Sequence, residues 1–596
     1  KADENAELTW QVTKESEGHK TPLLILYGSN GGSTQDMAQS AAIKAQELGF
    51  VVKLAFLDDF ANASKILAVS AYVLVLSATY NGCSPDHGVS FMKMLQNTGS
   101  LHEKPLYGVK YAVFGCGNTQ WAASYQAIPI AIDEGLEMIG CQRILPRHEG
   151  DSASDMEESF QSWLDVLWPN LASACQVVLE KTSTGKSVLS MPLVEVLPGD
   201  DKASVLALDY EHGAVKMRIA ENFELIEDSS TQSVRHIEFD LEPGASYSAG
   251  DHLAVYPEND PELVSKMLNR LQLHSSTIVR IGADPLANQK ERIVKLSDWL
   301  LRAVDLSKGS SAQAISHLAS RAKLHLDQVT LQTLSSTNHA QRVQMPLLEL
   351  LLKYESIEVS LAEVLALLPP MKPRFYSISS SARTSPTRLS LTVGVLNVVT
   401  GSGREHRGVC SSYLASQKVD ARVWATIRDT GSSFRLPPSP TPIVLVGPGT
   451  GLAPLRGFLQ DLQQQRKEGV AIGSVHLFFG CRTPSEFLYE KELRQFEADG
   501  TLTKLHVAFS RCQEKQYVQH LMRMHASELW PILKDGGHVF VCGDASRMAP
   551  DVRDVVSFIV RNGSGMDERA CSTYIQEMRA SHDGKRYHED VWAGNA

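Results

Sequence analysis

Along the first 170 residues, short apolar runs alternate with amphipathic stretches. The apolar runs predict strands at 22–27, 51–56, 72–77 and 109–114, and the amphipathic stretches predict helices such as 35–48 and 128–139. This βαβ alternation is typical of a doubly wound parallel sheet, which binds ligands at the carboxyl ends of its strands.

The pattern changes twice after residue 172. Strand-like segments at 214–226, 233–241 and 251–256 follow one another without helices, and similar segments return at 375–380, 389–398 and 421–428. A region rich in Leu and Ala, roughly 261–368, has a helical pattern and separates the two sets. From residue 442 the βαβ alternation resumes, with strands expected at 443–446, 475–479, 505–509 and 538–542.

These patterns predict a multidomain chain of α/β and β domains. The expected order is a polar N-terminal tail (1–20), a doubly wound α/β domain (21–172), a Ser/Thr/Lys-rich linker (173–200), an antiparallel β-barrel (201–258 and 370–440) with a helical connecting domain inserted in it (259–369), and a Rossmann-like α/β domain (441–596).

Composition and charge exclude several classes of protein. No apolar run approaches the roughly 20 residues that span a bilayer, and the polar first 20 residues predict neither a signal peptide nor a membrane anchor. Nine cysteines without a CxxC pair argue against a disulfide framework and a metal site, and favour a cytoplasmic setting. Of the net charge of −11, −9 falls in residues 1–170, which carry 11 Lys/Arg and 20 Asp/Glu. Nucleic-acid binding is therefore not expected. Either a solvated acidic surface or a face that steers a basic partner explains the excess.

Three loops follow three predicted strands of the first α/β domain. Small and hydroxyl residues of Gly28-Ser29-Asn30-Gly31-Gly32-Ser33-Thr34 precede a helix, where backbone N–H groups favour a phosphate. The loops Ala78-Thr79-Tyr80-Asn81-Gly82 and Gly115-Cys116-Gly117-Asn118, the second followed by Trp121 and Tyr125, add backbone donors and aromatic rings. Either ring alone is explained by surface packing, but the three loops together predict a planar phosphorylated ligand.

These loops resemble those of the flavodoxin family, whose ligand is FMN. The resemblance implies that the first loop holds the phosphate and that Tyr80 and Trp121 enclose the flavin ring. The implied FMN contacts are Ser29, Asn30, Gly31, Gly32, Ser33, Thr34, Ala78, Tyr80, Asn81, Gly82, Gly115, Gly117, Asn118, Trp121, Tyr125 and Asp151.

A second constellation pairs Arg374-Phe375-Tyr376-Ser377 with Gly408-Val409-Cys410-Ser411 about 30 residues later. Arginine can neutralise a pyrophosphate, tyrosine can stack on a ring, and Gly-x-x-Ser at a helix start can hold phosphate oxygens. The pair resembles the FAD-binding barrel of the ferredoxin–NADP reductase family. This implies Tyr376 on the flavin ring, Arg374 on the pyrophosphate, and Ser377, Gly408, Val409, Cys410 and Ser411 beside them.

A third constellation begins with the glycine turn Gly447-Pro448-Gly449-Thr450-Gly451 between a strand and a helix, a general dinucleotide-binding device. Arg and Lys at later strand ends suit the 2′-phosphate that distinguishes NADPH from NADH, although a solvated basic edge is the alternative. The expected dinucleotide contacts are Gly449, Thr450, Arg456, Cys481, Arg482, Ser510, Arg511, Lys515, Tyr517, Asp544 and Met548.

Cys542, Asp590 and Trp592 stand apart from these loops. A cysteine at a strand end is ordinarily a core residue, and a single Trp is often a plug. In the reductase family, however, the resemblance implies that Ser377, Cys542 and Asp590 converge beside the flavin, orient the nicotinamide and balance charge as hydride moves. Trp592 would cover the flavin ring and move aside for the nicotinamide.

From about residue 20 onward the chain resembles diflavin reductases of the NADPH–cytochrome P-450 reductase type, and most of all the reductase half of self-sufficient bacterial fusions. The residues that carry this are Phe114-Gly115-Cys116-Gly117 and the segments 447–457, 517–520 and 590–594. The resemblance implies FMN, FAD and NADPH as cofactors, and electron flow from NADPH through FAD and FMN to a haem protein such as a cytochrome P-450, on the same polypeptide or separate. Sulfite reductase, methionine synthase or a nitric oxide synthase-like haem are alternative acceptors, and a non-catalytic nucleotide-binding scaffold is the alternative class.

Overall fold

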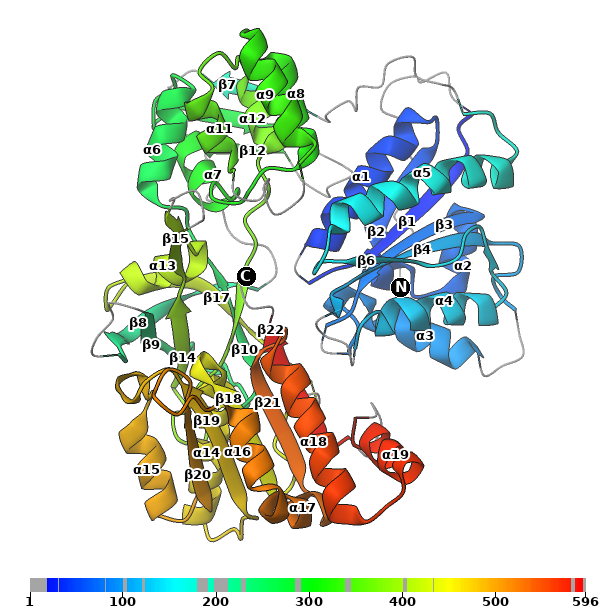
Figure 1. Cartoon of the computed structure of the whole chain (residues 1–596). Coiled ribbons are helices and arrows are strands. Elements are labelled where there is room, and N and C mark those ends of the chain that lie inside the picture. Colours follow the sequence, from blue (N-terminus) through cyan, green and yellow to red (C-terminus); the bar gives the residue numbers. More distant parts are fainter. Residues whose placement is uncertain are drawn as a thin grey trace. The chain divides into compact units, whose positions relative to one another are not determined.

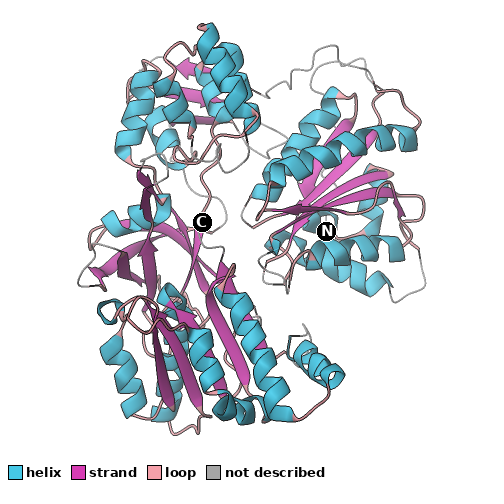
Figure 2. Cartoon of the chain, in the orientation of Figure 1, coloured by secondary structure: helices cyan, strands magenta, loops and turns pink. Residues whose placement is uncertain are grey.

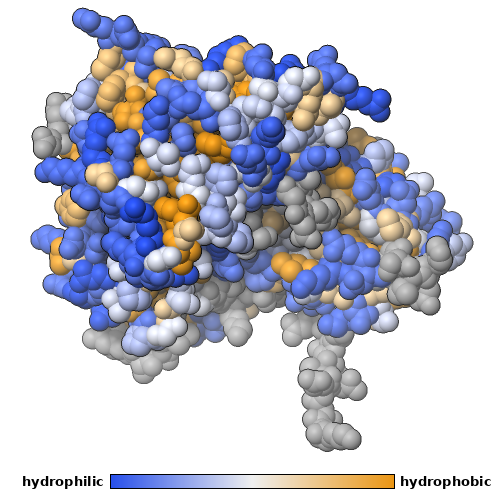
Figure 3. Space-filling view, turned by 90° about the horizontal axis from the view of Figure 1, so that it is seen from below, coloured by the Kyte–Doolittle hydropathy of each residue, from blue (hydrophilic) through white to orange (hydrophobic). Residues whose placement is uncertain are grey.

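A computed structural model describes residues 19–30, 32–80, 82–99, 104–119, 124–179, 191–197, 213–226, 232–283, 291–337, 345–399, 405–431, 434–579 and 585–592 (Figure 1). The chain divides into two compact units, one formed by 1–193 with 282–292 and the other by 194–281 with 293–596. Among the residues described, no helix is both long enough and apolar enough to cross a membrane. The face seen in Figure 3 is largely hydrophilic, with scattered apolar patches.

The first unit contains a parallel sheet in the order β2-β1-β3-β4-β5. Strand β6 pairs with the later residues of β4, whose first residues pair with β5. This is the flavodoxin-like strand order, and it confirms the predicted doubly wound sheet. The strands are β1 (Pro22–Gly28), β2 (Val51–Phe56), β3 (Tyr72–Ala78), β4 (Lys110–Gly117), β5 (Gln142–Arg143) and β6 (His148–Asp151).

Helices cover both faces of this sheet (Figure 2). Strand β1 shows why, because Leu23 and Ile25 are buried in one core, whereas Leu24 and Leu26 are buried in the other. Helices α1 and α5 complete the first core, and α3 and α4 complete the second. The helices are α1 (Ser33–Glu47), α2 (Ala63–Val69), α3 (Val89–Gly99), α4 (Ala127–Met138) and α5 (Met156–Cys175).

The second unit begins with an antiparallel sheet in the order β13-β10-β17-β8-β9-β14. Its two edge strands meet at an isolated antiparallel bridge between Ile378 and Leu391, where the Ser379 N–H donates to the Ser390 carbonyl over 2.7 Å. The predicted barrel is thus an antiparallel sheet whose edges come together at this point. The strands are β8 (Val215–Glu224), β9 (Ser233–Asp240), β10 (His252–Tyr256), β13 (Arg374–Ser377), β14 (Arg388–Val395) and β17 (Arg422–Arg428), with a hairpin of β15 (Asn397–Val399) and β16 (Glu405–Arg407) and helix α13 (Val409–Ser416) attached.

The inserted region is helical, but not wholly so. Short strands β11 (Ile278–Ile281) and β12 (Arg292–Lys295) lie within it and form a three-stranded sheet with β7 (Val194–Leu197). The helical pattern gave no sign of these strands, because four-residue strands are too short for a clear period of two. Its helices are α6 (Pro261–Arg270), α7 (Leu296–Arg302), α8 (Ala312–Arg321), α9 (His325–Ser335), α11 (Leu347–Lys353) and α12 (Leu361–Leu367).

The predicted linker 173–200 is partly structured. Helix α5 continues to Cys175, and β7 pairs antiparallel with β11 through Leu197 and Ile278. Residues 180–190 and 198–200 of the linker lie outside the described residues.

The last part of the chain forms a parallel sheet in the order β20-β19-β18-β21-β22, the Rossmann-like arrangement that was expected. Strand β22 was not predicted, because most of its residues are polar. The strands are β18 (Ile443–Pro448), β19 (Val475–Cys481), β20 (Lys504–Phe509), β21 (His538–Asp544) and β22 (Tyr587–Trp592), and the helices are α14 (Leu452–Lys467), α15 (Glu490–Ala498), α16 (Val518–Met524), α17 (Ala526–Lys534), α18 (Met548–Ser564) and α19 (Glu568–Arg579).

Candidate cofactor sites and hydride-transfer cluster

In the first unit, the loops after β1 and β3 are joined at the carboxyl edge of the sheet. The Ser29 hydroxyl accepts the N–H of Gly32 at 2.8 Å, and the Tyr80 hydroxyl accepts the N–H of Asn30 at 2.9 Å. Strand β1 lies between β2 and β3, so this edge is the topological switch point where such sheets bind ligands. The structure therefore brings the predicted phosphate loop and the predicted stacking tyrosine together.

Helix α1 starts in a way that suits a phosphate. Its N-cap is Gly32, which has a positive φ of 78°, and no side chain caps the helix. The N–H groups of a first helical turn have no partner within the helix and carry partial positive charge. Ser33 begins this turn, and Thr34 is buried within it.

The loop after β4 lies close to Tyr125. A Cβ on Gly117 would lie 2.7 Å from the Tyr125 ring, and one on Gly115 would lie 1.8 Å from the Gln126 side-chain oxygen. Glycine is therefore required at both positions by close packing. Asn118 is buried at this end of β4.

Asp151, at the end of β6, fixes the same loop. Its carboxylate accepts the Thr119 N–H at 3.0 Å, the Thr119 hydroxyl at 2.7 Å and the Ala153 N–H at 2.9 Å. Burial alone would raise the pKa of Asp151, but these hydrogen bonds lower it below its usual value. Asp151 therefore supports the loop as an anion. Gly31, Asn81 and Trp121 lie outside the described residues, whereas Ala78 ends β3 and Gly82 follows with a positive φ of 81°.

In the second unit, Tyr376 on β13 lies beside Cys410 on α13. Burial raises the pKa of Tyr376 well above its usual value and that of Cys410 to about 12, so both groups are neutral. Arg374, two residues before Tyr376, forms an ion pair with Asp305 at 3.0 Å. The predicted pyrophosphate contact is thus also held by a carboxylate of the inserted region.

Helix α13 repeats the arrangement at α1. Gly408 is its N-cap, no side chain caps it, and Val409 begins it. The Ser411 hydroxyl accepts the N–H of Leu396 at 3.1 Å, and a Cβ on Gly408 would lie 2.6 Å from that hydroxyl oxygen. The residues present fit an anionic group at this helix start.

Three strands of the second unit deliver side chains to one carboxylate, that of Asp590 on a fourth strand, β22. The Ser377 hydroxyl donates to Asp590 Oδ2 at 2.7 Å, His252 Nε2 lies 3.1 Å from the same oxygen, and the Cys542 thiol lies 3.9 Å from it. The strand registers explain the convergence, because His252 on β10 faces Ser377 on β13, and Cys542 on β21 faces Asp590 on β22. The predicted trio is therefore brought together, with a histidine added.

The charges of this cluster support one another. Burial alone would raise the pKa of Asp590, yet His252 and the hydrogen bonds to the carboxylate lower it. Burial alone would lower the pKa of His252, yet Asp590 raises it. Burial and Asp590 both raise the pKa of Cys542 far above its usual value. The cluster thus contains a carboxylate, a histidine that tends to hold a proton, and a neutral thiol.

Sequence reasoning missed His252. Nothing in its local sequence marks it, because it stands in an ordinary apolar strand, and only its register with Ser377 reveals the role. Trp592 ends β22, pairs in register with Asp544 and is 39% exposed, and its role over the flavin ring stays a prediction.

The glycine turn between β18 and α14 lies against this cluster. A Cβ on Gly451 would lie 2.2 Å from the Cys542 carbonyl oxygen, and one on Gly447 would lie 2.5 Å from the Gly451 carbonyl oxygen. Helix α14 has Gly451 as its N-cap and no side-chain cap. Space is open around Gly449, whose φ is 56°. The turn therefore fits the close approach of an anionic ligand beside Cys542, with Thr450 next to it.

The predicted 2′-phosphate residues gather at the ends of β19 and β20. The Ser510 N–H donates to the Cys481 carbonyl at 2.9 Å, and the Arg511 N–H donates to the Arg482 carbonyl at 2.9 Å. Farther along the same loop, the Lys515 ammonium lies 5.3 Å from the centre of the Tyr517 ring. Basic groups therefore cluster at one edge of the parallel sheet.

Two predicted contacts support the turn after β21. Asp544 accepts the Ser546 N–H at 2.7 Å and the Arg547 N–H at 2.8 Å, while Met548 lies against Gly543, where a Cβ would be 2.9 Å from its methyl group.

Arg456 differs from the expectation of a cofactor contact. Its guanidinium forms an ion pair with Glu492 at 2.6 Å, donates to the Ser379 carbonyl at 2.8 Å and lies 4.4 Å from the centre of the Tyr489 ring. The side chain is 12% exposed. These contacts make Arg456 a link between the antiparallel sheet and the Rossmann-like domain, and its contact with a dinucleotide stays a prediction.

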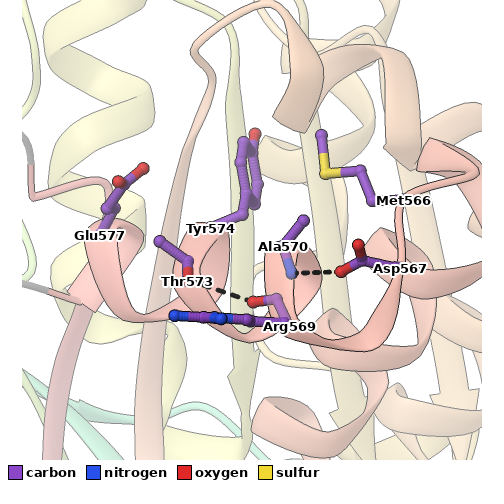
Figure 4. A pocket seen from close by; sticks show the side chains of 7 residues that line it. All are labelled: Met566, Asp567, Arg569, Ala570, Thr573, Tyr574 and Glu577. Carbon is purple, nitrogen blue, oxygen red and sulfur yellow. Dashed lines mark hydrogen bonds between the residues drawn. The ribbon is translucent and has the colours of Figure 1, made fainter.

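A depression of about 460 Å³ on α19 contains none of the predicted site residues. Figure 4 shows its side chains on α19 and on the two residues before it, where the Ala570 N–H donates to Asp567 at 2.8 Å and the Thr573 hydroxyl donates to the Arg569 carbonyl at 3.1 Å. These are ordinary helix contacts, and we assign no ligand to this depression.

Comparison with known proteins agrees with this arrangement. Three family models match: Flavodoxin over residues 25–163, FAD binding domain over 209–413 and Oxidoreductase NAD-binding domain over 445–554.

Individual relatives can be aligned with nearly all of this chain. It is 36% identical to bifunctional cytochrome P450/NADPH–P450 reductase 2 of Bacillus subtilis (strain 168), over 100% of this chain and 56% of that protein. It is 39% identical to the bifunctional reductase 1 of the same strain, over 96% and 54%. It is 30% identical to the NADPH–cytochrome P450 reductase of Dictyostelium discoideum, over 98% and 91%. The chain thus spans about half the length of the bifunctional relatives and most of the last one.

Proposed function

The chain belongs to the NADPH–cytochrome P450 reductase family, and on that premise we propose that it passes electrons from NADPH to a haem protein, most simply a cytochrome P450. Its three matched domains take FMN, FAD and NADPH as cofactors. Bound flavins link a two-electron donor to one-electron acceptors, and the protein supplies placement and electrostatics.

The observation that carries the proposal is the shared carboxylate of Asp590. Its negative charge would balance the positive charge that develops on a nicotinamide ring bound beside it, and the Ser377 hydroxyl holds the carboxylate in place. His252 can hold or release a proton at Nε2, 3.1 Å from that carboxylate. The neutral thiol of Cys542 fills the remaining side.

Other residues bind and gate. The uncapped helix starts at Gly32, Gly408 and Gly451 orient three anionic groups, and Tyr376 offers a ring for stacking. Trp592, exposed at the end of β22, would cover the stacking face and would have to move aside for a nicotinamide to enter.

None of the described residues identifies the electron acceptor, so a haem acceptor is inferred from the names of the relatives. The acidic first 170 residues, with a net charge of −9, favour a basic partner. Sulfite reductase and methionine synthase remain the alternative acceptors. All nine cysteines are free, which supports a cytoplasmic setting.

The test has two stages. Denaturing the purified protein should release FMN and FAD in near-equal amounts, about one of each per chain; FAD without FMN would remove the electron route through the first unit. NADPH-driven reduction of purified candidate acceptors then follows. Rapid reduction of a cytochrome P450 haem, with no reduction of sulfite reductase, supports the proposal. Reduction of sulfite reductase but not of the cytochrome P450 would make sulfite reductase the assigned acceptor.

A further inference from the structure

Two cysteines lie at the edge that carries the predicted 2′-phosphate residues. Cys481 ends β19, and Cys512 follows β20 by three residues. In the parallel register Cys481 faces Phe509, and paired strands lie about 4.8 Å apart. The turn after Phe509 is hydrogen-bonded to the end of β19. The N–H groups of Ser510 and Arg511 donate to the carbonyls of Cys481 and Arg482, each at 2.9 Å. Cys512 is the next residue in this turn.

The two thiols differ in exposure, and the charge of one affects the pKa of the other. Burial, together with smaller contributions from the charges that Glu486 and Cys512 can carry, raises the pKa of the Cys481 thiol to about 12. Cys512 is exposed and lines an open depression of about 500 Å³ together with Phe509, Gln513, Glu514 and Gln516. Cys512 is therefore readily accessible to a reagent, and the half-buried Cys481 is less so.

We propose that Cys481 and Cys512 form a reversible thiol–disulfide switch that weakens binding of the dinucleotide 2′-phosphate, a regulation that rests on the function proposed above. The oxidant is a low-molecular-weight disulfide such as oxidised glutathione. The Cys512 thiolate breaks its S–S bond, forms a mixed disulfide and releases one glutathione. Cys481 then gives up its proton to solvent and attacks the Cys512 sulfur, which forms the protein disulfide and releases the second glutathione. Two protein thiols lose two electrons, and one oxidised glutathione gains them.

The consequence for binding follows from the position of the turn. A disulfide holds its Cβ atoms roughly 3.5–4.5 Å apart, so the bond would fix Cys512 against Cys481 at the end of β19. Ser510 and Arg511 precede Cys512 directly, and Lys515 follows it by three residues. Closing the bond therefore displaces the groups expected on the phosphate. Loss of one charge-assisted hydrogen bond weakens binding by about tenfold.

The reaction should have a clear pH dependence. Because the pKa of Cys481 is raised to about 12, only a small fraction of this thiol is ionised near neutral pH. The closing step should therefore speed up by about tenfold for each pH unit between 7 and 9. Below this range the mixed disulfide at Cys512 should accumulate first.

The test uses the full-length flavin-loaded protein and adenosine 2′,5′-bisphosphate, whose binding requires no electron transfer. After treatment with oxidised glutathione and blocking of free thiols, peptide mapping should find a Cys481–Cys512 disulfide, and the Kd measured by calorimetry should rise at least tenfold. Reduction with dithiothreitol should restore it. Cys512→Ser should bind the bisphosphate as the untreated protein does and should not respond to the oxidant. Cys83→Ser, which removes the other exposed cysteine, should still respond.

Either of two results overturns the switch: no Cys481–Cys512 linkage after oxidation at pH 9, or a linkage that leaves the Kd unchanged. Failure of the proposed function is seen separately. Suppose that the untreated protein binds adenosine 2′,5′-bisphosphate and forms the disulfide on oxidation, yet reduces no haem acceptor. In that case the switch stands and the acceptor assignment falls.

Discussion

Replacing Asp590 by Asn tests the hydride-transfer cluster most directly. The substitution keeps the size of the side chain and an acceptor oxygen for Ser377, but it removes the negative charge that faces His252. The site is nearly closed to water, since the side chains of Asp590 and His252 are 9% and 16% exposed. A lost charge is therefore poorly replaced by solvent.

The magnitude follows from the hydrogen bonds. Those of Ser377 and His252 to the carboxylate, at 2.7 Å and 3.1 Å, change from charge-assisted to neutral. A hydrogen bond to a charged group is worth about 1 kcal/mol more than a neutral one, so about 2 kcal/mol of charge stabilisation is lost. If this stabilisation acts on the positive charge of the nicotinamide, flavin reduction slows about thirtyfold.

The assay is anaerobic stopped-flow measurement of flavin bleaching at saturating NADPH. Binding of adenosine 2′,5′-bisphosphate should be unchanged, because its residues lie at β19 and β20. Since Asp590 raises the pKa of His252, the limb of the pH profile that belongs to His252 should move to lower pH in the variant. Asp535→Asn, at an exposed carboxylate of the same domain, is the charge-matched control. A rate within twofold of the unmodified protein, or an unmoved limb, would refute the reasoning.

Three further outcomes are expected. Trp592→Ala should relax discrimination between NADPH and NADH in steady-state kinetics, because the stacking face is freed; unchanged preference would count against the gating role. Gly451→Ala should weaken NADPH binding and lower Tm, since its Cβ would lie 2.2 Å from the Cys542 carbonyl oxygen, and wild-type values for both would contradict this close packing. Hydrogen bonds from Ser360, His317 and Arg321 overcome burial and lower the pKa of Glu363 to about 2. Because this folded-state value is below the usual 4.5, the stabilisation is complete above pH 4.5 and is lost as pH falls toward 2. The urea midpoint from pH 6 to pH 3.5 should fall less in Glu363→Gln than in the unmodified protein; equal slopes would contradict the assignment.

Buried parallel strands were predicted to within a few residues because they are continuous apolar runs. Strand β18 shows this, since Ile443, Val444, Leu445 and Val446 are all buried. Strand β22 shows the opposite case. His588 and Asp590 are buried in it, but their polar character hides the strand from any hydrophobic pattern.

The candidate site was predictable where glycine, hydroxyl and aromatic residues sit at strand ends, as at Ser29 and Gly451. Roles that depend on distant partners were not. His252 gains its role from strand β13, about 125 residues later, and Arg456 is bound by Glu492 on another helix. Neither partner can be found by reading neighbouring residues, because both depend on sheet register and packing.

The order of strands in the antiparallel sheet has a consequence for synthesis of the chain. Strand β10 ends at Tyr256, but its neighbours β13 and β17 begin at Arg374 and Arg422. A ribosome that adds 5–20 residues per second needs roughly 6–24 s to reach β13. During that time the apolar β10 has neither partner, although the parallel sheet of the first unit is already complete in sequence. A nascent chain stopped just after Tyr256 should therefore recruit chaperones, and one stopped after β17 should not.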